Sequence, residues 1–124
     1  MKDSDSPILA YQAMIDQLAS ETTRSVSSDI VKTGLFLETS DDAPYNELLT
    51  SLTASQREIL SRALLAERSD AIHDVLAVLT WWIECRGVSL TFKGQPMPVD
   101  LSGMGLHGDF VGRRSDWDWP VGAS

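Results

Sequence analysis

The feature that most constrains the fold is one long stretch of helical pattern, residues 54–86. It follows Thr53, which with Gln56 spells a capping box, and it stops at Gly87, a residue suited to helix ends. A helix of about 33 residues would be roughly 50 Å long if it were straight. So long an element dominates a chain of 124 residues and predicts a mainly α fold.

Apolar residues form two stripes on this helix, one in each half. Projected at about 100° per residue, the stripes are offset by roughly 100° or more. We favour a bend or break near Arg68–Asp70 that turns both stripes to one core; the alternative is a straight central helix with core on two sides. The first stripe consists of Gln56, Ile59, Leu60, Ala63 and Leu64, and the second of Ile72, Val75, Leu76, Leu79, Trp82 and Ile83.

Three shorter helices are expected before the long one. Ser6 and Pro7 start an amphipathic helix over about residues 7–21. The stretch "DIVKTGLFLE" predicts a second helix, capped by Ser28 or Asp29. A short third helix, "YNELLTSL", follows Pro44.

The period changes after the long helix, in "VSLTFKGQPMPV". Apolar and polar residues alternate up to Phe92, and Lys93–Gly94 stands where a hairpin turn belongs. Pro96 and Pro98 limit the returning strand to an edge. One short helix is expected around residues 108–113, inside an irregular tail rich in Gly and Trp.

These patterns predict a mainly α fold of four to five helices packed as a small bundle, with a C-terminal β-hairpin and the irregular tail docked on the helices. We expect a single domain over residues 1–124, with a helical body at about 7–86 and the hairpin and tail at about 88–120. The second stripe, Trp82 included, is expected in its core.

Composition and charge narrow the function classes. A net charge of −8 and a pI of about 4.5 repel phosphate backbones, so no nucleic acid is expected, and a basic partner is favoured. Apolar runs are too short to span a membrane, and the acidic start is unlike a secretory signal. The single cysteine, Cys85, excludes an intramolecular disulfide. We therefore expect a cytoplasmic protein.

Glu67, Asp70, His73 and Asp74 form a polar cluster within about 120° of arc on an ideal helix. Carboxylates and imidazole at this spacing can share a divalent metal or polarise a water molecule. The same arc is where a solvated face is expected, and no strong metal motif is spelled. His107, Arg113 and Arg114 complete the candidate site, provided that the tail folds over this cluster.

The segment "GMGLHG", residues 103–108, spells G-x-G-x-x-G. It lacks the long helix and the later acidic residue of a dinucleotide site, so its glycines are expected to serve tight turns and close backbone approach. No cofactor is expected.

Three tryptophans are candidates for interaction: Trp81, Trp117 and Trp119. Trp81 points away from the centre of the second stripe, and the other two alternate in "DWDWP" as in an extended segment. They either dock the tail over the helices or leave an aromatic patch for a partner.

The segments "ERSDAIHDVLAVL", "LTFKGQPMPV", "DFVGRR" and "WDWP" resemble those of a family of small bacterial domains of unknown function. The resemblance covers about residues 52–120 and implies a helical body, a bacterial source and no known activity. It also implies that the helix around His73 touches the tail around Arg113–Trp119.

Function remains open between two classes at this point. The leading hypothesis is a non-enzymatic protein-interaction domain that binds a protein partner or itself as a homodimer. The alternative is a metal-assisted hydrolase or small-anion-binding protein, with the Glu67–Asp74 face as ligands or base and an arginine holding the anion.

Overall fold

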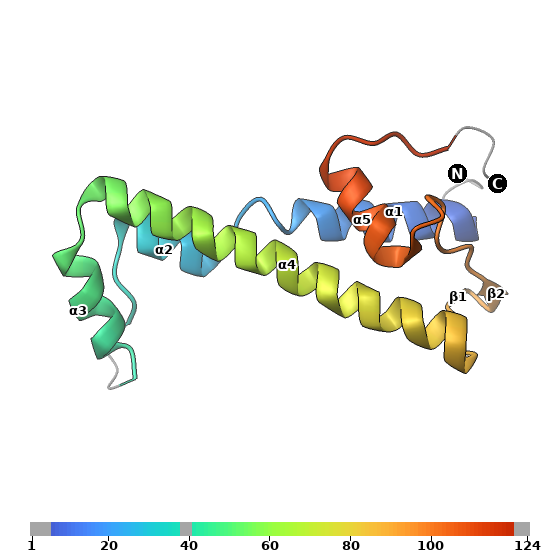
Figure 1. Ribbon diagram of the computed structural model, residues 1–124, viewed down its shortest axis with the longest axis horizontal. Helices are drawn as coiled ribbons and strands as arrows, with labels where there is room; N and C mark the ends of the chain where they lie inside the picture. The colour runs from blue at the N-terminus through green and yellow to red at the C-terminus, as the bar shows by residue number, and fades with distance from the viewer. Residues whose placement is uncertain (1–5, 38–40, 121–124) are drawn as a thin grey trace. The chain divides into compact units, whose positions relative to one another are not determined.

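The computed structural model describes residues 6–37 and 41–120, and it is mainly α. Within these ranges the chain forms five helices and a two-stranded antiparallel sheet (Figure 1). None of these helices is long and apolar enough to cross a membrane. The elements are α1 (Pro7–Ser20), α2 (Val26–Thr33), α3 (Ala43–Ser51), α4 (Ala54–Arg86), β1 (Thr91–Phe92), β2 (Gln95–Pro96) and α5 (Gly105–Arg114).

The described chain divides into two compact units. Unit 1 contains residues up to 21 and from 70 onward, and unit 2 contains residues 22–69. The long helix α4 contributes its first half to unit 2 and its second half to unit 1. Our expectation of one domain over residues 1–124 stays a prediction.

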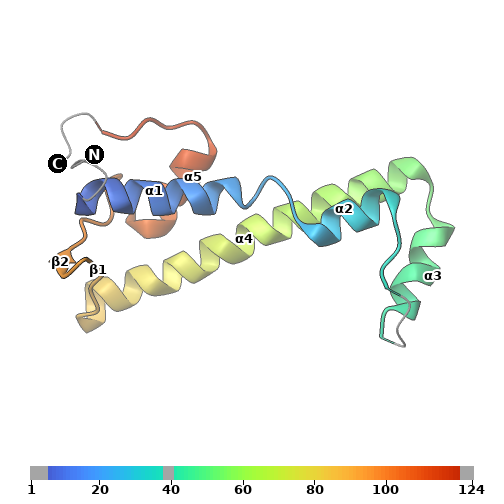
Figure 2. The same cartoon turned by 180° about the vertical axis from the view of Figure 1, so that it is seen from behind.

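The core of unit 1 is built around two helices from opposite ends of the chain. Helix α1 packs chiefly against α5, and the two lie side by side in both views (Figures 1 and 2). Their buried side chains close around one residue of α4, which gives the core cluster Tyr11, Ile15, Leu76, Leu106 and Phe110.

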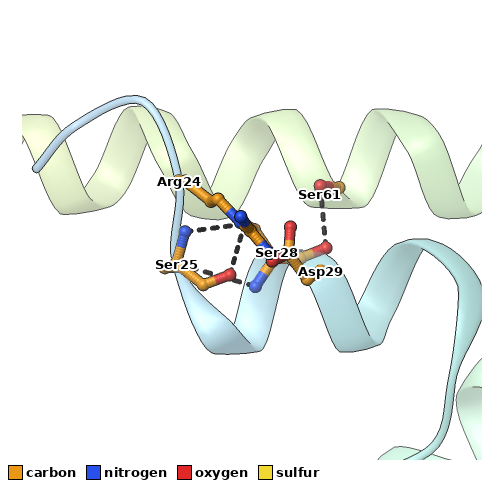
Figure 3. A network of polar contacts seen from close by, with 5 residues as sticks. All are labelled: Arg24, Ser25, Ser28, Asp29 and Ser61. Carbon is orange, nitrogen blue, oxygen red and sulfur yellow. Dashed lines mark hydrogen bonds and ion pairs between the residues drawn. The ribbon is translucent and has the colours of Figure 1, made fainter. Parts of the chain in front are cut away.

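Unit 2 begins with a fully formed capping box at α2. The Ser25 hydroxyl oxygen accepts from the Ser28 amide at 3.0 Å, and the Ser28 side chain accepts from the Ser25 amide at 3.2 Å. The backbone oxygen of buried Ser28 in turn accepts from the Ser61 hydroxyl of α4 at 2.9 Å (Figure 3). The Arg24–Asp29 ion pair beside it is solvent-exposed and contributes little to stability.

The other end of α2 is capped by an arginine of α4. The Arg57 guanidinium donates to the carbonyl oxygens of Val31 at 2.7 Å and Ile30 at 3.2 Å, and also to that of Gly34. The end of a helix leaves carbonyls such as that of Val31 without an intrahelical donor. The Ile30 carbonyl also accepts from the Gly34 amide at 2.7 Å. Arg57 thereby joins α2 to α4 within unit 2.

The prediction for the second helix was wrong at both ends. It begins after Ser25 rather than at Ser28 or Asp29, because Ser25 is the residue whose hydroxyl accepts from the first turn. It ends at Thr33, and Gly34 takes an extended conformation at the cap. Of the predicted segment, residue 38 lies outside the described residues.

The predicted bend near Arg68–Asp70 was also wrong, because α4 is one unbroken helix from Ala54 to Arg86. The two stripes are offset since each half of the helix belongs to a different unit. The predicted start is confirmed: the Thr53 amide donates to Gln56 Oε1 at 2.9 Å, and the Gln56 amide donates to Thr53 Oγ1 at 3.1 Å.

The second stripe contributes less to the core than expected. Only Leu76 is buried, whereas Trp82 is 42% exposed and Leu79 is 39% exposed. Ile72 and Ile83 are partly buried and pack against the core cluster to which Leu76 belongs, so the rest of the stripe stays exposed.

The segments after α4 follow the prediction closely. Lys93 and Gly94 have φ values of 51° and 79°, as a two-residue hairpin turn requires, and they join β1 to β2. Helix α5 includes the predicted residues 108–113 and starts three residues earlier, at Gly105.

The irregular tail is docked on α1, as predicted. The Trp119 ring lies edge-on to Tyr11 with ring centres 6.0 Å apart, and its Nε1 donates to Asp16 Oδ2 at 3.2 Å. A β-hairpin and a docked Gly/Trp-rich tail on a mainly α body therefore describe this fold.

Candidate functional site

Two of the predicted site residues meet in one cavity. His73 of α4 and His107 of α5 lie with ring centres 5.2 Å apart and ring planes at 89°. Both line a cavity of about 430 Å³ within unit 1, and Trp117 of the tail lies on its wall. The sequence predicted this meeting on the condition that the tail folds over α4.

Hydrogen bonds hold both imidazole rings at their Nδ1 atoms. His73 Nδ1 lies 3.1 Å from Asp74 Oδ1, and His107 Nδ1 lies 3.3 Å from the Thr80 hydroxyl. Thr80 is buried in α4, one turn beyond Leu76. Its hydroxyl accepts from the Leu106 amide at 3.0 Å and donates to the Leu76 carbonyl at 2.8 Å.

Glycine makes the close approach of His107 sterically feasible. Gly105 has a φ of +86°, and a Cβ atom there would lie 2.8 Å from His107 Cε1 and 2.8 Å from Thr80 Cγ2. A side chain at this position would therefore displace the His107 ring or the threonine. This is the role in close approach that the sequence predicted for the glycines of "GMGLHG".

The carboxylates of the predicted cluster are spread over the surface of α4. Asp74 contacts His73 and is largely exposed, Asp70 is exposed, and Glu67 is an exposed residue of unit 2. Their assignment to a site stays a prediction.

Arg113 and Arg114 make contacts within the protein rather than lining the histidine cavity. Arg113 Nε donates to Asp16 Oδ1 at 2.6 Å, and the same guanidinium donates to the Trp117 carbonyl and lies 5.2 Å from the centre of the Trp119 ring. Arg114 lies over the Phe110 ring at 5.4 Å. Arg113 therefore joins α5, the tail and α1.

Sequence reasoning missed the polar centre of unit 1, a buried carboxylate. Asp109 is fully buried and accepts from the amides of Leu101 at 2.8 Å and Ser102 at 2.7 Å, and also from the Tyr11 hydroxyl. Burial raises the pKa of the Tyr11 phenol well above its usual range, and the hydrogen bond to Asp109 raises it further. Tyr11 and Asp109 are 98 positions apart, so no local sequence motif indicates that they form a hydrogen bond.

A second surface feature is the apolar face of α4, which we define as Val75, Val78, Leu79, Trp81 and Trp82. The exposed fractions of these side chains are 60%, 58%, 39%, 48% and 42%. The rings of Trp81 and Trp82 pack edge to face at 5.3 Å, and the Arg86 guanidinium lies 5.2 Å from the Trp82 ring.

An apolar groove of about 440 Å³ adjoins this face within unit 1. Leu79 and Val75 belong to both, and Met14 and Leu18 of α1 form another part of the groove wall. A helix that is apolar on its core side and on its solvent side is typical of one that packs against a further element.

Comparison with known proteins assigns the family but no activity. The model of a family of unknown function, DUF6547, matches residues 4–121. The chain belongs to DUF6547. No curated protein and no solved structure matches it.

For this DUF6547 chain, function has to be inferred from the two features above. Within residues 6–37 and 41–120, no group of three or more His, Cys, Asp and Glu side chains is placed to hold a metal ion together. The histidine cavity therefore contains two side chains that can bind a metal, and the apolar face consists of side chains that can only be buried against another surface.

Proposed function

We propose that this chain is a non-enzymatic, cytoplasmic protein-interaction domain that binds a basic amphipathic helix of a partner protein on the apolar face of α4. The observation that supports the proposal is the exposure of Val75, Val78, Trp81 and Trp82 on one helix. Tryptophan is among the residue types that most often dominate the binding energy in protein interfaces.

The charge around the face favours a basic occupant over a second copy. The charged residues of α4 from position 70 onward are Asp70, Asp74, Glu84 and Arg86, and Arg86 already lies over Trp82. The chain as a whole carries a net charge of −8, so two copies repel each other at long range. A helix with lysines beside its apolar stripe would gain both burial and attraction.

A pair of synthetic amphipathic peptides tests this proposal. One has leucines on one helical face and lysines on the other, and the second has glutamate in place of every lysine. We expect only the lysine peptide to bind, and its affinity should fall as NaCl rises from about 50 mM to about 500 mM, because salt screens its attraction to Asp70, Asp74 and Glu84. Equal binding of both peptides, or of neither, would overturn the proposal.

A matched pair of variants locates the contact. Val78→Asp places a charge in the apolar face and should weaken binding at least about tenfold, or about 1.4 kcal/mol. Val26→Asp is the control, since Val26 is 76% exposed in unit 2 and should leave binding unchanged. Light scattering on the free protein should give a monomer; a dimer that Val78→Asp dissociates would assign the face to self-association instead.

A further inference from the structure

The cavity between His73 and His107 is a distinct feature that the interaction proposal does not use. Neither histidine belongs to the apolar face, and both are half-buried. The question is which chemistry two imidazoles in one cavity can perform, and the answer depends on which nitrogen of each ring carries the proton.

The hydrogen bonds of Thr80 determine the protonation of His107. A hydroxyl has one hydrogen to donate and two lone pairs that accept. The Thr80 hydroxyl donates its hydrogen to the Leu76 carbonyl, and one of its lone pairs accepts from the Leu106 amide. Towards His107 it can only accept, so the neutral imidazole carries its hydrogen on Nδ1. The Nε2 lone pair of His107 is then available.

The same nitrogen of His73 is left available by Asp74. A carboxylate only accepts, so the contact of 3.1 Å between His73 Nδ1 and Asp74 Oδ1 requires the hydrogen on Nδ1. A histidine held by a carboxylate at one nitrogen while the other binds a metal is a recurring arrangement in metal sites. Both rings thus have the tautomer that leaves Nε2 free to bind a metal.

The spacing of the rings also suits a shared ion. Two imidazoles that bind one tetrahedral Zn²⁺ at about 2.0–2.1 Å have ring centres roughly 5 Å apart. The separation here is 5.2 Å. Gly105 supplies the room for His107 to lie this close to α4, since any Cβ there would collide with the ring.

We propose that His73 and His107 bind a borderline divalent transition-metal ion, of which Zn²⁺ is the probe, through their Nε2 atoms. Imidazole nitrogen suits zinc, copper and nickel, whereas magnesium and calcium prefer oxygen ligands. With two protein ligands, water fills the remaining positions, and the ion exchanges with solvent.

Zinc titration of a Cys85→Ser protein tests the site, because the exposed Cys85 thiol could itself bind zinc and is removed by this change. Saturating Zn²⁺ should raise the melting temperature by about 5 °C, since an ion that binds the folded state stabilises it. Mg²⁺ should give no shift. No shift with Zn²⁺ would overturn the proposal.

Two ring-preserving variants, His73→Phe and His107→Phe, show whether the ion binds at this cavity. Each should abolish the zinc shift and the visible absorption of bound Co²⁺, while Asp74→Asn should weaken zinc binding about 10–100-fold. A zinc shift that survives both phenylalanine variants would overturn the proposal. Because His107→Phe also removes a hydrogen bond to Thr80, the surface-side His73→Phe is the decisive variant.

The tautomers can be measured separately, in the protein without metal. Nitrogen NMR of the histidine rings above pH 7 should show the hydrogen on Nδ1 in both. A hydrogen on Nε2 of either ring would contradict the derivation from Thr80 and Asp74 and would overturn the site.

Discussion

Asp109 is the residue on which the polar interior of unit 1 depends. Its two oxygens accept from three donors that lie in α1 and in the segment before α5, and none of its surface is exposed. A buried carboxylate of this kind costs desolvation free energy, and the hydrogen bonds have to offset that cost.

Replacing this carboxylate should destabilise the protein strongly. In Asp109→Ala the Tyr11 hydroxyl and two backbone amides lose their acceptor inside the core, so we expect a loss of about 3–5 kcal/mol in the free energy of unfolding. Urea denaturation measures it. Asp118→Ala, at an exposed position of the docked tail, is the matched control and should change stability by less than about 0.5 kcal/mol.

The Tyr11 phenol should make the free energy of unfolding fall at alkaline pH. Its pKa is raised in the folded state, so above the ordinary tyrosine pKa of about 10 the unfolded chain loses a proton that the folded chain keeps. Stability should therefore be unaffected by this group below pH 10 and fall by about 1.4 kcal/mol per pH unit above it. In Tyr11→Phe the slope from this group should vanish; an unchanged slope would mean that Tyr11 ionises normally in the fold.

At the scale of elements, the tail demonstrates how a segment without regular structure becomes fixed. Asp16 accepts from Arg113 with one oxygen and from the Trp119 indole with the other. The Arg113 guanidinium also lies over the Trp119 ring. One carboxylate of α1 thus anchors both the end of α5 and the tail that follows it.

Two tryptophan truncations separate a docked ring from an exposed one. Trp119→Ala should lower the free energy of unfolding by about 2–3 kcal/mol, because it removes a half-buried ring that packs on Tyr11 and bonds Asp16. Trp81→Ala, at an exposed ring on α4, should cost less than about 1 kcal/mol. Thermal unfolding compares them, and equal losses would contradict the assignment of Trp119 to docking.

Elements with local signals were predictable from sequence, and those set by tertiary contacts were not. The capping box at Thr53, the turn at Lys93–Gly94 and the stop at Gly87 depend on neighbours within a few residues, and all three appear in the structure. Gly34 is a local signal for the end of α2, but the hydrogen bonds from Arg57, 23 residues further on, cannot be read from the sequence around α2.

The long helix was predicted at its observed bounds, but the bend in it was wrong, because periodicity shows that a stripe is apolar but not what covers it. We assumed one core for both stripes, and a bend followed from that assumption. Each half of α4 belongs to its own unit, and Trp82 is left exposed. The sequence predicted the proximity of His73 and His107 only on the condition that the tail folds over α4, since 34 positions separate the two residues.

For the molecule as a whole, the division into two units predicts that a mutation in one unit changes amide exchange in that unit and leaves it unchanged in the other. Arg57→Met removes the guanidinium that donates to the carbonyls of Val31 and Gly34 at the end of α2. Amide exchange in residues 22–69 should therefore accelerate, as expected for a loss of about 1–3 kcal/mol. Amides around Tyr11 and Phe110 should keep their protection. Arg62→Met, at an exposed position of α4, is the control.

Equal acceleration throughout the chain in Arg57→Met would contradict two independent units. It would instead support the single cooperative domain expected from the sequence.

The hydrogen bond from Tyr11 to Asp109 spans 98 positions, and that from Arg113 to Asp16 spans 97. On the ribosome, α1 therefore emerges long before its partner helix is synthesised. The contacts within residues 22–69, in contrast, join residues that are near each other in the sequence. The apolar side of α1 therefore stays without its partner until α5 has been synthesised. During that interval the nascent chain exposes apolar surface on which non-native contacts can form.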